Sequence, residues 1–298
     1  MTRQTKATAI GFCAIILWSS IVGLIKEVSH SFGATAGAAL IYTVASMFLL
    51  FTMKWVPLSK FPKKYLIYGG VLMVSYELCL ALSIGYSTNS RQAIEVGMVN
   101  YLWPTFTMVA TILFNNKKAN WLIAPGIILS MLGIVWVLGG EQGLDISQMI
   151  ANIKTNPLSY GLAFIGALLW AAYCVVTVRI ANGVNGITLF FIMVAVALWI
   201  KYLIIGDSSS MQITLSSAIY LLLASCAMGF GYAAWNIGIL HGNVTVLTGA
   251  SYFIPVLSSA LSSILLFTTL GVSFWQGAVM VCIGSVLCWQ ATRERKNK

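Results

Sequence analysis

The chain has 298 residues, of which 59% are hydrophobic and only 8% are charged. Soluble domains carry charged residues at roughly a quarter of their positions, so this composition excludes an ordinary soluble protein and indicates a lipid environment. The formal charge of +10 would suit a nucleic-acid-binding protein only if the basic residues clustered on a soluble surface.

The sequence predicts ten transmembrane helices, so the expected fold is that of an all-α integral membrane protein. A bilayer core about 30 Å thick needs roughly 20 apolar residues per helix, and stretches of that length recur with short polar breaks. They are longer than barrel strands and lack strict alternation, so barrels are excluded. In chain order the predicted spans are residues 7–26, 34–55, 65–87, 93–114, 121–139, 157–178, 186–205, 216–239, 245–268 and 272–292.

Residues 141–156 form the longest polar stretch. The apolar residues within it, Ile146, Met149, Ile150 and Ile153, fall on one helical face, which predicts an interfacial helix in an external linker. This linker divides the chain into a five-helix repeat at residues 1–140 and a second at residues 157–298.

Lysine and arginine residues gather on one predicted side of the membrane. With the N-terminus inside, the outer side holds Lys26, Arg91, Lys154 and Lys201. This asymmetry follows the positive-inside rule with both termini cytoplasmic, so the basic charge reports topology and no nucleic-acid partner is expected. The inner side holds the other residues, Arg3, Lys6, Lys54, Lys60, Lys63, Lys64, Lys117, Lys118, Arg179, Arg293, Arg295, Lys296 and Lys298.

The cysteines indicate no metal or cofactor chemistry. They all fall inside predicted spans, with neither a C-x-x-C pair nor a nearby histidine, so we expect packing residues and neither a metal nor a cofactor. The six are Cys13, Cys79, Cys174, Cys226, Cys282 and Cys288.

An internal repeat relates the two halves of the chain. Each half holds five predicted spans, an odd number, so the second copy enters the membrane from the opposite side and the duplication is inverted. Inverted repeats suit a protein that exposes one site alternately to two sides, which favours transport. At an offset of 151 residues the matches are Tyr101 with Tyr252, Pro104 with Pro255, Gly126 with Gly277 and Gly133 with Gly284; small shifts add Trp18 with Trp170 and Gly85 with Gly238.

Glu77 lies near the middle of the third span, where a lipid-exposed carboxylate would be strongly unfavourable. We therefore expect it to face the interior. Two functional roles fit, a proton carrier or a partner for a cationic group of the substrate, and a purely structural alternative is a hydrogen-bonded tie between helices. Glu95 follows Arg91 by four residues near a helix start, which predicts a local ion pair.

The fourth span carries a polar and aromatic cluster at Asn100, Tyr101 and Trp103, directly before Pro104. Proline frees a backbone carbonyl one turn earlier, so a helix kink and a binding surface are expected here. The matching segment of the second repeat supplies Ser251, Tyr252 and Pro255. Either proline could instead serve helix packing alone.

Aromatic residues also recur at mid-membrane depth, away from the interfacial belts. A cavity walled by them would stack on a flat apolar ring or attract an organic cation, although helix packing accounts equally well for any single one. The residues are Tyr76, Trp103, Trp170, Tyr173, Tyr232, Trp235 and Tyr252.

Several long segments resemble the bacterial aromatic amino acid exporters of the drug/metabolite transporter superfamily, the branch with two EamA-type domains. They run through both halves and are residues 75–86, 93–104, 156–160, 170–174, 233–245 and 251–259. The resemblance implies an inner-membrane protein with both termini cytoplasmic that exports phenylalanine, tyrosine and tryptophan. It places Tyr76, Glu77, Asn100, Tyr101, Trp103, Trp170, Ser251 and Tyr252 at a central cavity.

One segment departs from that family's pattern. Many EamA domains carry an acid between their fourth and fifth helices, whereas this chain has Asn115-Asn-Lys-Lys-Ala-Asn120. A coupling role carried over from that acid is therefore unsafe.

We predict an exporter that binds an aromatic amino acid near the bilayer midplane and works by alternating access, with membrane lipid as its surroundings. Trp103, Trp170 and Tyr101 would stack on the ring, with Tyr173 as a further contact. Asn100 and Ser251 would take the amino and carboxylate groups. Glu77 would contact the ammonium or couple protons.

Three alternatives compete with this prediction. Export of cationic or apolar drugs would also suit an aromatic cavity with one buried acid. A membrane-embedded enzyme would need clustered aspartates, a His-Asp pair or a Cys-His set, but Asp145, Asp207, His30 and His241 stand apart in the sequence. A scaffold or receptor gives no reason for an inverted repeat.

Overall fold

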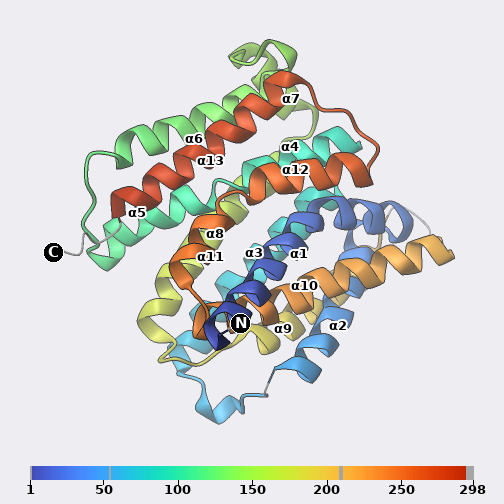
Figure 1. The fold of residues 1–298 in the computed structure, drawn as a ribbon. Helices are drawn as coiled ribbons and strands as arrows, with labels where there is room; N and C mark the ends of the chain where they lie inside the picture. Colours follow the sequence, from blue (N-terminus) through green and yellow to red (C-terminus); the bar gives the residue numbers. More distant parts are fainter. Residues whose placement is uncertain (1, 54, 208–210, 293–298) are drawn as a thin grey trace.

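A computed structural model of the protein describes residues 2–53, 55–207 and 211–292, and its regular structure there is entirely helical (Figure 1). Of the predicted inner-side cations, Lys54, Arg293, Arg295, Lys296 and Lys298 lie outside the described residues. The first half contains α1 (Arg3–Phe32), α2 (Ala34–Thr52), η1 (Leu58–Lys60), η2 (Tyr65–Gly69), α3 (Gly70–Gly85), α4 (Ser90–Asn100), α5 (Trp103–Asn115), α6 (Ile123–Leu138) and η3 (Gly140–Gln142).

The connecting helix α7 (Ile146–Thr155) leads into the second half. Asp145 caps it by accepting a hydrogen bond from the Gln148 backbone N–H, so the linker does form a helix. The second half contains α8 (Pro157–Ile180), α9 (Ile187–Ile205), α10 (Leu215–His241), α11 (Val244–Ser251), α12 (Ile254–Leu265) and α13 (Val272–Thr292).

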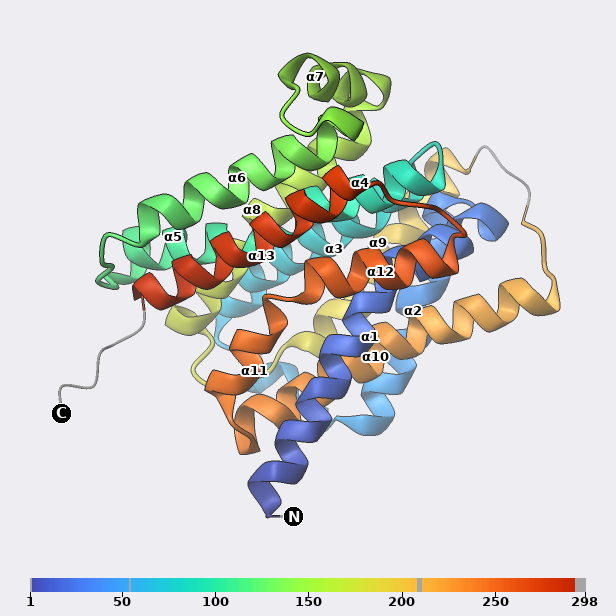
Figure 2. The same ribbon diagram turned by 45° about the horizontal axis from the view of Figure 1, so that its top comes forward.

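The membrane architecture predicted from the sequence is confirmed. In the described chain, eight helical segments are long and apolar enough to cross a membrane, and α6 and α12 are shorter apolar helices. Together with α11, which precedes α12, they account for the ten predicted spans. One end of the bundle carries α7, and we call it the α7 end. The opposite end, where α1 begins and α13 ends, is called the terminal end (Figure 2).

The fourth and ninth spans are each divided into two helices, a feature that hydropathy did not show. The α4–α5 break is a turn at Tyr101–Leu102, and the α11–α12 break is a turn at Tyr252–Phe253. Pro104 and Pro255 are the second residues of the helices that follow. Proline has no N–H to donate to the carbonyl four residues earlier, so the continuous helix ends one turn before each proline. The breaks occupy equivalent positions of the two repeats.

Helices α6 and α13 pack closely along their length, and their contact has the symmetry of the repeat (Figure 1). A Cβ atom built on Gly126 would lie 2.9 Å from the Gly284 carbonyl oxygen, and one on Gly133 would lie 2.7 Å from that of Gly277. In the repeat, Gly126 corresponds to Gly277 and Gly133 to Gly284. Replacing each glycine by its counterpart therefore converts the first contact into the second, and the two helices run antiparallel. Such a two-fold contact between antiparallel partners is the geometry of an inverted repeat.

The other helices interleave the two halves. Helix α1 packs against α10, α11 and α12 of the second half, and α8 packs against α3, α4 and α5 of the first. Exchanging the repeats turns one set of neighbours into the other. The space between α1, α3, α8 and α10 therefore lies between the halves, and both helix breaks border it.

Candidate functional site

A cavity of about 230 Å³ occupies this space. We call it the central cavity. Its walls come from both halves and include residues on either side of each helix break. The lining residues are Trp18, Ile21, Val22, Tyr76, Leu80, Asn100, Tyr101, Trp103, Trp170, Cys174, Met228, Tyr232, Trp235, Ser251 and Ile254.

Six of the nine predicted binding residues line the central cavity, namely Tyr76, Asn100, Tyr101, Trp103, Trp170 and Ser251. The other three, Glu77, Tyr173 and Tyr252, are not among its lining residues. The Tyr252 ring packs on Trp289 with a centroid distance of 6.0 Å. The Tyr173 hydroxyl lies 3.3 Å from that of Tyr65, and its ring supports Trp170 from behind at 5.6 Å.

The walls of the central cavity are a connected set of aromatic rings. Trp170 contacts Tyr76, Trp103 and Tyr232 at centroid distances of 4.7, 6.0 and 6.5 Å. Trp18, the repeat counterpart of Trp170, contacts Tyr232 at 5.1 Å. Such tilted and edge-to-face contacts hold the rings in fixed positions and leave ring faces available to a flat ligand.

The indole nitrogen of Trp170 is buried and has no hydrogen-bond acceptor within the described chain. A buried donor without a partner costs about 1–3 kcal/mol, so the Trp170 N–H is an unsatisfied donor on a residue that lines the central cavity. The Trp18 nitrogen is also buried and unpartnered, and a Cβ atom built on Gly231 would come within 2.7 Å of it.

The last residues of α4 and α11, Asn100 and Ser251, carry side-chain oxygens that can accept hydrogen bonds. The Asn100 side-chain amide donates to the Ala163 carbonyl at 3.3 Å, and its oxygen accepts no hydrogen bond from the described residues. The Ser251 hydroxyl donates to the Thr248 carbonyl at 2.8 Å, which leaves the lone pairs of its oxygen available. The residues that line the central cavity thus include an unsatisfied N–H donor, two side chains with free oxygen acceptors and several aromatic rings.

Glu77 is fully buried directly behind this wall. The Tyr42 hydroxyl donates to one of its carboxyl oxygens at 2.6 Å, and the Tyr232 hydroxyl donates to the other at 2.8 Å. These bonds tie α3 to α2 and α10. Because Tyr232 also lines the central cavity, the carboxyl group is connected to the cavity through one tyrosine rather than exposed in it.

Several lining residues were not predicted as site residues. Tyr232 and Trp235 were identified only as aromatic residues at mid-membrane depth, and Trp18 only through its repeat match with Trp170. That match was the signal that could have placed Trp18 at the site. Met228 and Cys174 are apolar residues among many in the spans, and no sequence pattern distinguishes them.

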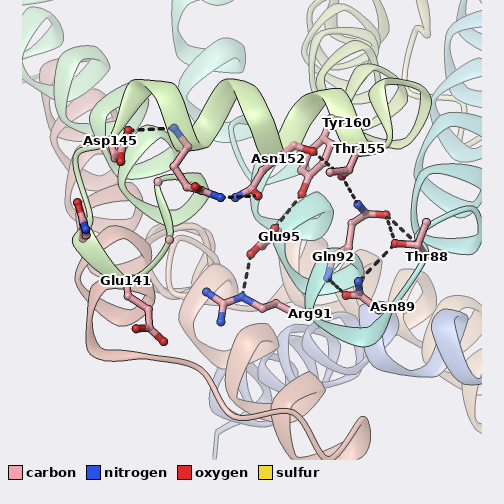
Figure 3. A pocket seen from close by; sticks show the side chains of 14 residues that line it. Thr88, Asn89, Arg91, Gln92, Glu95, Glu141, Asp145, Asn152, Thr155 and Tyr160 are labelled. Atoms are coloured by element: carbon pink, nitrogen blue, oxygen red, sulfur yellow. Dashed lines mark hydrogen bonds and ion pairs between the residues drawn. The ribbon is translucent and has the colours of Figure 1, made fainter.

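A second pocket, of about 570 Å³, lies at the α7 end between the start of α4, the η3 segment, α7 and the start of α8 (Figure 3). We call it the polar pocket. Glu95 accepts from Arg91 at 3.1 Å and from the Tyr160 hydroxyl at 2.8 Å. The predicted Arg91–Glu95 ion pair is thus confirmed.

Gln92 extends the hydrogen bonding of the polar pocket to neighbouring elements (Figure 3). Its side chain donates to the Thr155 hydroxyl at 3.1 Å and accepts from the Asn156 amide at 2.9 Å. The polar pocket is a hydrogen-bonded junction of α4, α7 and α8, whose central polar groups already have partners in the protein.

Ten helical spans in a two-fold inverted arrangement, with a cavity at the broken helices, define a multi-pass membrane protein of the inverted-repeat transporter class. The EamA-like transporter family matches residues 5–139 and 157–290, and the chain belongs to this family.

Curated relatives cover nearly the whole chain. The aromatic amino acid exporter YddG of Salmonella typhimurium (strain 14028s / SGSC 2262) is 55% identical over 99% of this chain and 100% of its own length. The protein of the same name from Escherichia coli (strain K12) is 55% identical over 98% and 99%. One solved structure is 20% identical, covers 98% of this chain and 100% of its own, and superposes with a TM-score of 0.67, which supports the fold.

Proposed function

We propose that this protein exports aromatic amino acids across the bacterial inner membrane by alternating access through the central cavity. The supporting observation is a cavity between the repeats whose walls are aromatic and include Trp170, a residue with an unpartnered indole N–H. The similarity to proteins named as aromatic amino acid exporters points to the same substrate class. The chain acts in transport, not catalysis.

In the proposed binding mode, Trp103, Trp170 and Tyr101 enclose the aromatic ring of the substrate. The Trp170 N–H donates to the carboxylate, and the oxygens of Asn100 and Ser251 accept from the ammonium group. A zwitterion needs both kinds of partner, whereas an organic cation needs only acceptors and ring faces.

The size of the central cavity also favours an amino acid over larger drugs. Its volume of about 230 Å³ is below the roughly 300–1,000 Å³ of pockets that hold drug-sized ligands. Export of cationic or apolar drugs is therefore the second candidate, and competition with tryptophan separates the two.

Glu77 is proposed to couple protons rather than to bind the substrate ammonium. Its carboxyl group is absent from the lining of the central cavity, and the Tyr232 hydroxyl bonded to it belongs to the wall. A proton on Glu77 would change the hydrogen bonding of Tyr232 and so the shape of the wall. This route transmits a charge change to the cavity without direct contact.

The proposed topology places both termini and the terminal end in the cytoplasm, with α7 as an interfacial helix on the outer side. Residues 1–140 and 157–298 are the two rocking units, and the divided spans lie where the units meet around the substrate.

Transport into vesicles of known orientation tests the function. Uptake of labelled phenylalanine, tyrosine, tryptophan and an organic cation is measured with and without a pH gradient. We expect the three amino acids to move in the export direction and the gradient to stimulate them. Transport of the cation alone would assign the protein to drug export instead.

A further inference from the structure

A groove of about 430 Å³ lies between α5 and the half of α8 nearest the terminal end. It is separate from both the central cavity and the polar pocket, and we call it the α5–α8 groove. Its α8 residues recur at helical spacing along one stripe of that helix, and its α5 residues do the same. They are Leu168, Ala171, Ala172, Val175, Val176 and Arg179 on α8, with Phe106, Val109, Ala110, Leu113 and Phe114 on α5.

The α5–α8 groove has the length and chemistry of a site for one acyl chain. The residues from Leu168 to Arg179 rise about 16 Å along the helix, close to half of a bilayer core roughly 30 Å thick. Phe106 borders the groove at the end away from Arg179, and its ring contacts Phe164 at 5.5 Å. Leu113 and Phe114 are 67% and 58% exposed, so the outer rim faces lipid.

Arg179 is the charged residue of this groove, and its guanidinium group has no ion pair or hydrogen bond with any described residue. Acidic residues of the described chain lie inside the bundle or towards the α7 end, so none can neutralise it. Three cations towards the α7 end have partners within the protein: Lys26 donates to the Ser87 carbonyl, Arg91 pairs with Glu95, and Lys201 donates to the Thr35 hydroxyl. Arg179 therefore has no anionic partner among the residues that the structure describes, and its membrane surroundings can supply one.

Helices α1 and α12 are the repeat counterparts of α8 and α5, and they pack closely at the equivalent position. Gly23 of α1 corresponds to Val175 of α8, and a Cβ atom on Gly23 would lie 3.0 Å from Leu265 and 3.2 Å from Ser262 of α12. Glycine lets α1 and α12 touch at this position, whereas α8 carries the larger Val175 there, which lines the groove. Glu27 replaces the cation at the position that matches Arg179. The α5–α8 groove is thus a particular feature of one face of the molecule.

We propose that the α5–α8 groove binds one acyl chain of an anionic phospholipid, whose phosphate pairs with Arg179. An apolar channel one leaflet long that ends at an unpaired cation complements such a lipid in both shape and charge. The bound chain would support α8 on the face opposite Trp170 and Cys174, which line the central cavity.

Native mass spectrometry of the full-length protein, titrated with phosphatidylglycerol or phosphatidylcholine of identical acyl chains, tests this proposal. The wild type should retain one phosphatidylglycerol about five-fold more strongly than phosphatidylcholine, the effect of one neutralised charge. Arg179→Gln should remove that preference. The matched control Lys63→Gln, which removes an exposed cation outside the groove, should keep it.

Filling the α5–α8 groove tests its apolar part. Ala172→Phe should lower binding of both lipids, and Ala110→Leu on the opposite wall provides a second variant if the first does not fold. Undiminished preference in Arg179→Gln, an equal loss in Lys63→Gln, or unchanged binding in a folded groove-filled variant would overturn the proposal. Because lipid binding is read without transport, its failure is distinguishable from failure of the export function.

Discussion

The central cavity and the polar pocket differ in size and in how their polar groups are satisfied. The polar pocket is the larger, at about 570 Å³ against about 230 Å³, yet Glu95, Tyr160 and Gln92 bond to partners within the protein. The central cavity is smaller and largely aromatic, and the Trp170 indole N–H has no partner in the described chain. Volume alone would favour the polar pocket of these two, whereas the aromatic walls and the unsatisfied Trp170 donor are the grounds for proposing the central cavity as the site for an aromatic ligand.

Among the substitutions that test this difference between the two pockets, Trp170→Ala should lower tryptophan affinity the most. The substitution removes the ring that contacts Tyr76, Trp103 and Tyr232, so tryptophan affinity should fall by at least about 30-fold. Binding to purified protein measures the change. Trp121→Ala, which removes an indole that is 77% exposed, is the matched control and should bind like the wild type. Equal tryptophan affinities in the two variants would show that the central cavity is not the binding site.

Trp170→Phe should have a smaller and more selective effect. It keeps a ring but removes the N–H proposed for the carboxylate, so tryptophan affinity should fall about tenfold. Tryptamine lacks the carboxylate, and its affinity should change little. An equal loss for both ligands would show that Trp170 acts through shape alone.

Glu77→Gln should uncouple transport from the pH gradient while tryptophan affinity stays within about threefold of the wild type, because the carboxyl group lies behind the wall. Transport with and without a gradient, together with equilibrium binding, measures the two effects separately. A gradient response equal to that of the wild type would remove Glu77 from coupling, and a large loss of affinity would place it in direct contact with substrate.

Tyr160→Phe should affect the polar pocket and leave the central cavity unchanged. Loss of the hydrogen bond to Glu95 should lower the free energy of unfolding by about 1–2 kcal/mol, with tryptophan affinity unaltered. Thermal unfolding in detergent measures the stability. Tyr68→Phe, at a residue that is 60% exposed, is the control. A loss of affinity in Tyr160→Phe would make the polar pocket part of the binding site.

Sequence patterns predicted the architecture because lipid imposes strong constraints on it. Span length, charge asymmetry and matched glycines led to the inverted repeat, and Gly126 and Gly133 do meet their repeat counterparts across α6 and α13. The division of two spans was only partly anticipated. Pro104 and Pro255 indicated an irregularity, but hydropathy alone does not distinguish a kinked helix from two helices joined by a turn.

The candidate site was harder to predict because hydropathy does not show which face of a buried helix borders a cavity. Tyr252 has the same sequence context as Tyr101, yet its ring packs on Trp289. Glu77 was identified as an intramembrane acid, but its hydrogen bond to Tyr42 of another helix depends on tertiary packing. Trp18 could be placed only through the repeat match, because nothing else in its span distinguishes it.

Competition binding measures whether the protein recognises both the ring and the charged groups of an aromatic amino acid. Labelled tryptophan bound to the purified protein is challenged with phenylalanine, leucine, tryptamine and a quaternary ammonium ion. We expect phenylalanine to displace tryptophan, with leucine and the ammonium ion at least about tenfold weaker, since they lack the ring or the carboxylate. Tight binding of the ammonium ion that zwitterionic tryptophan fails to displace would contradict it.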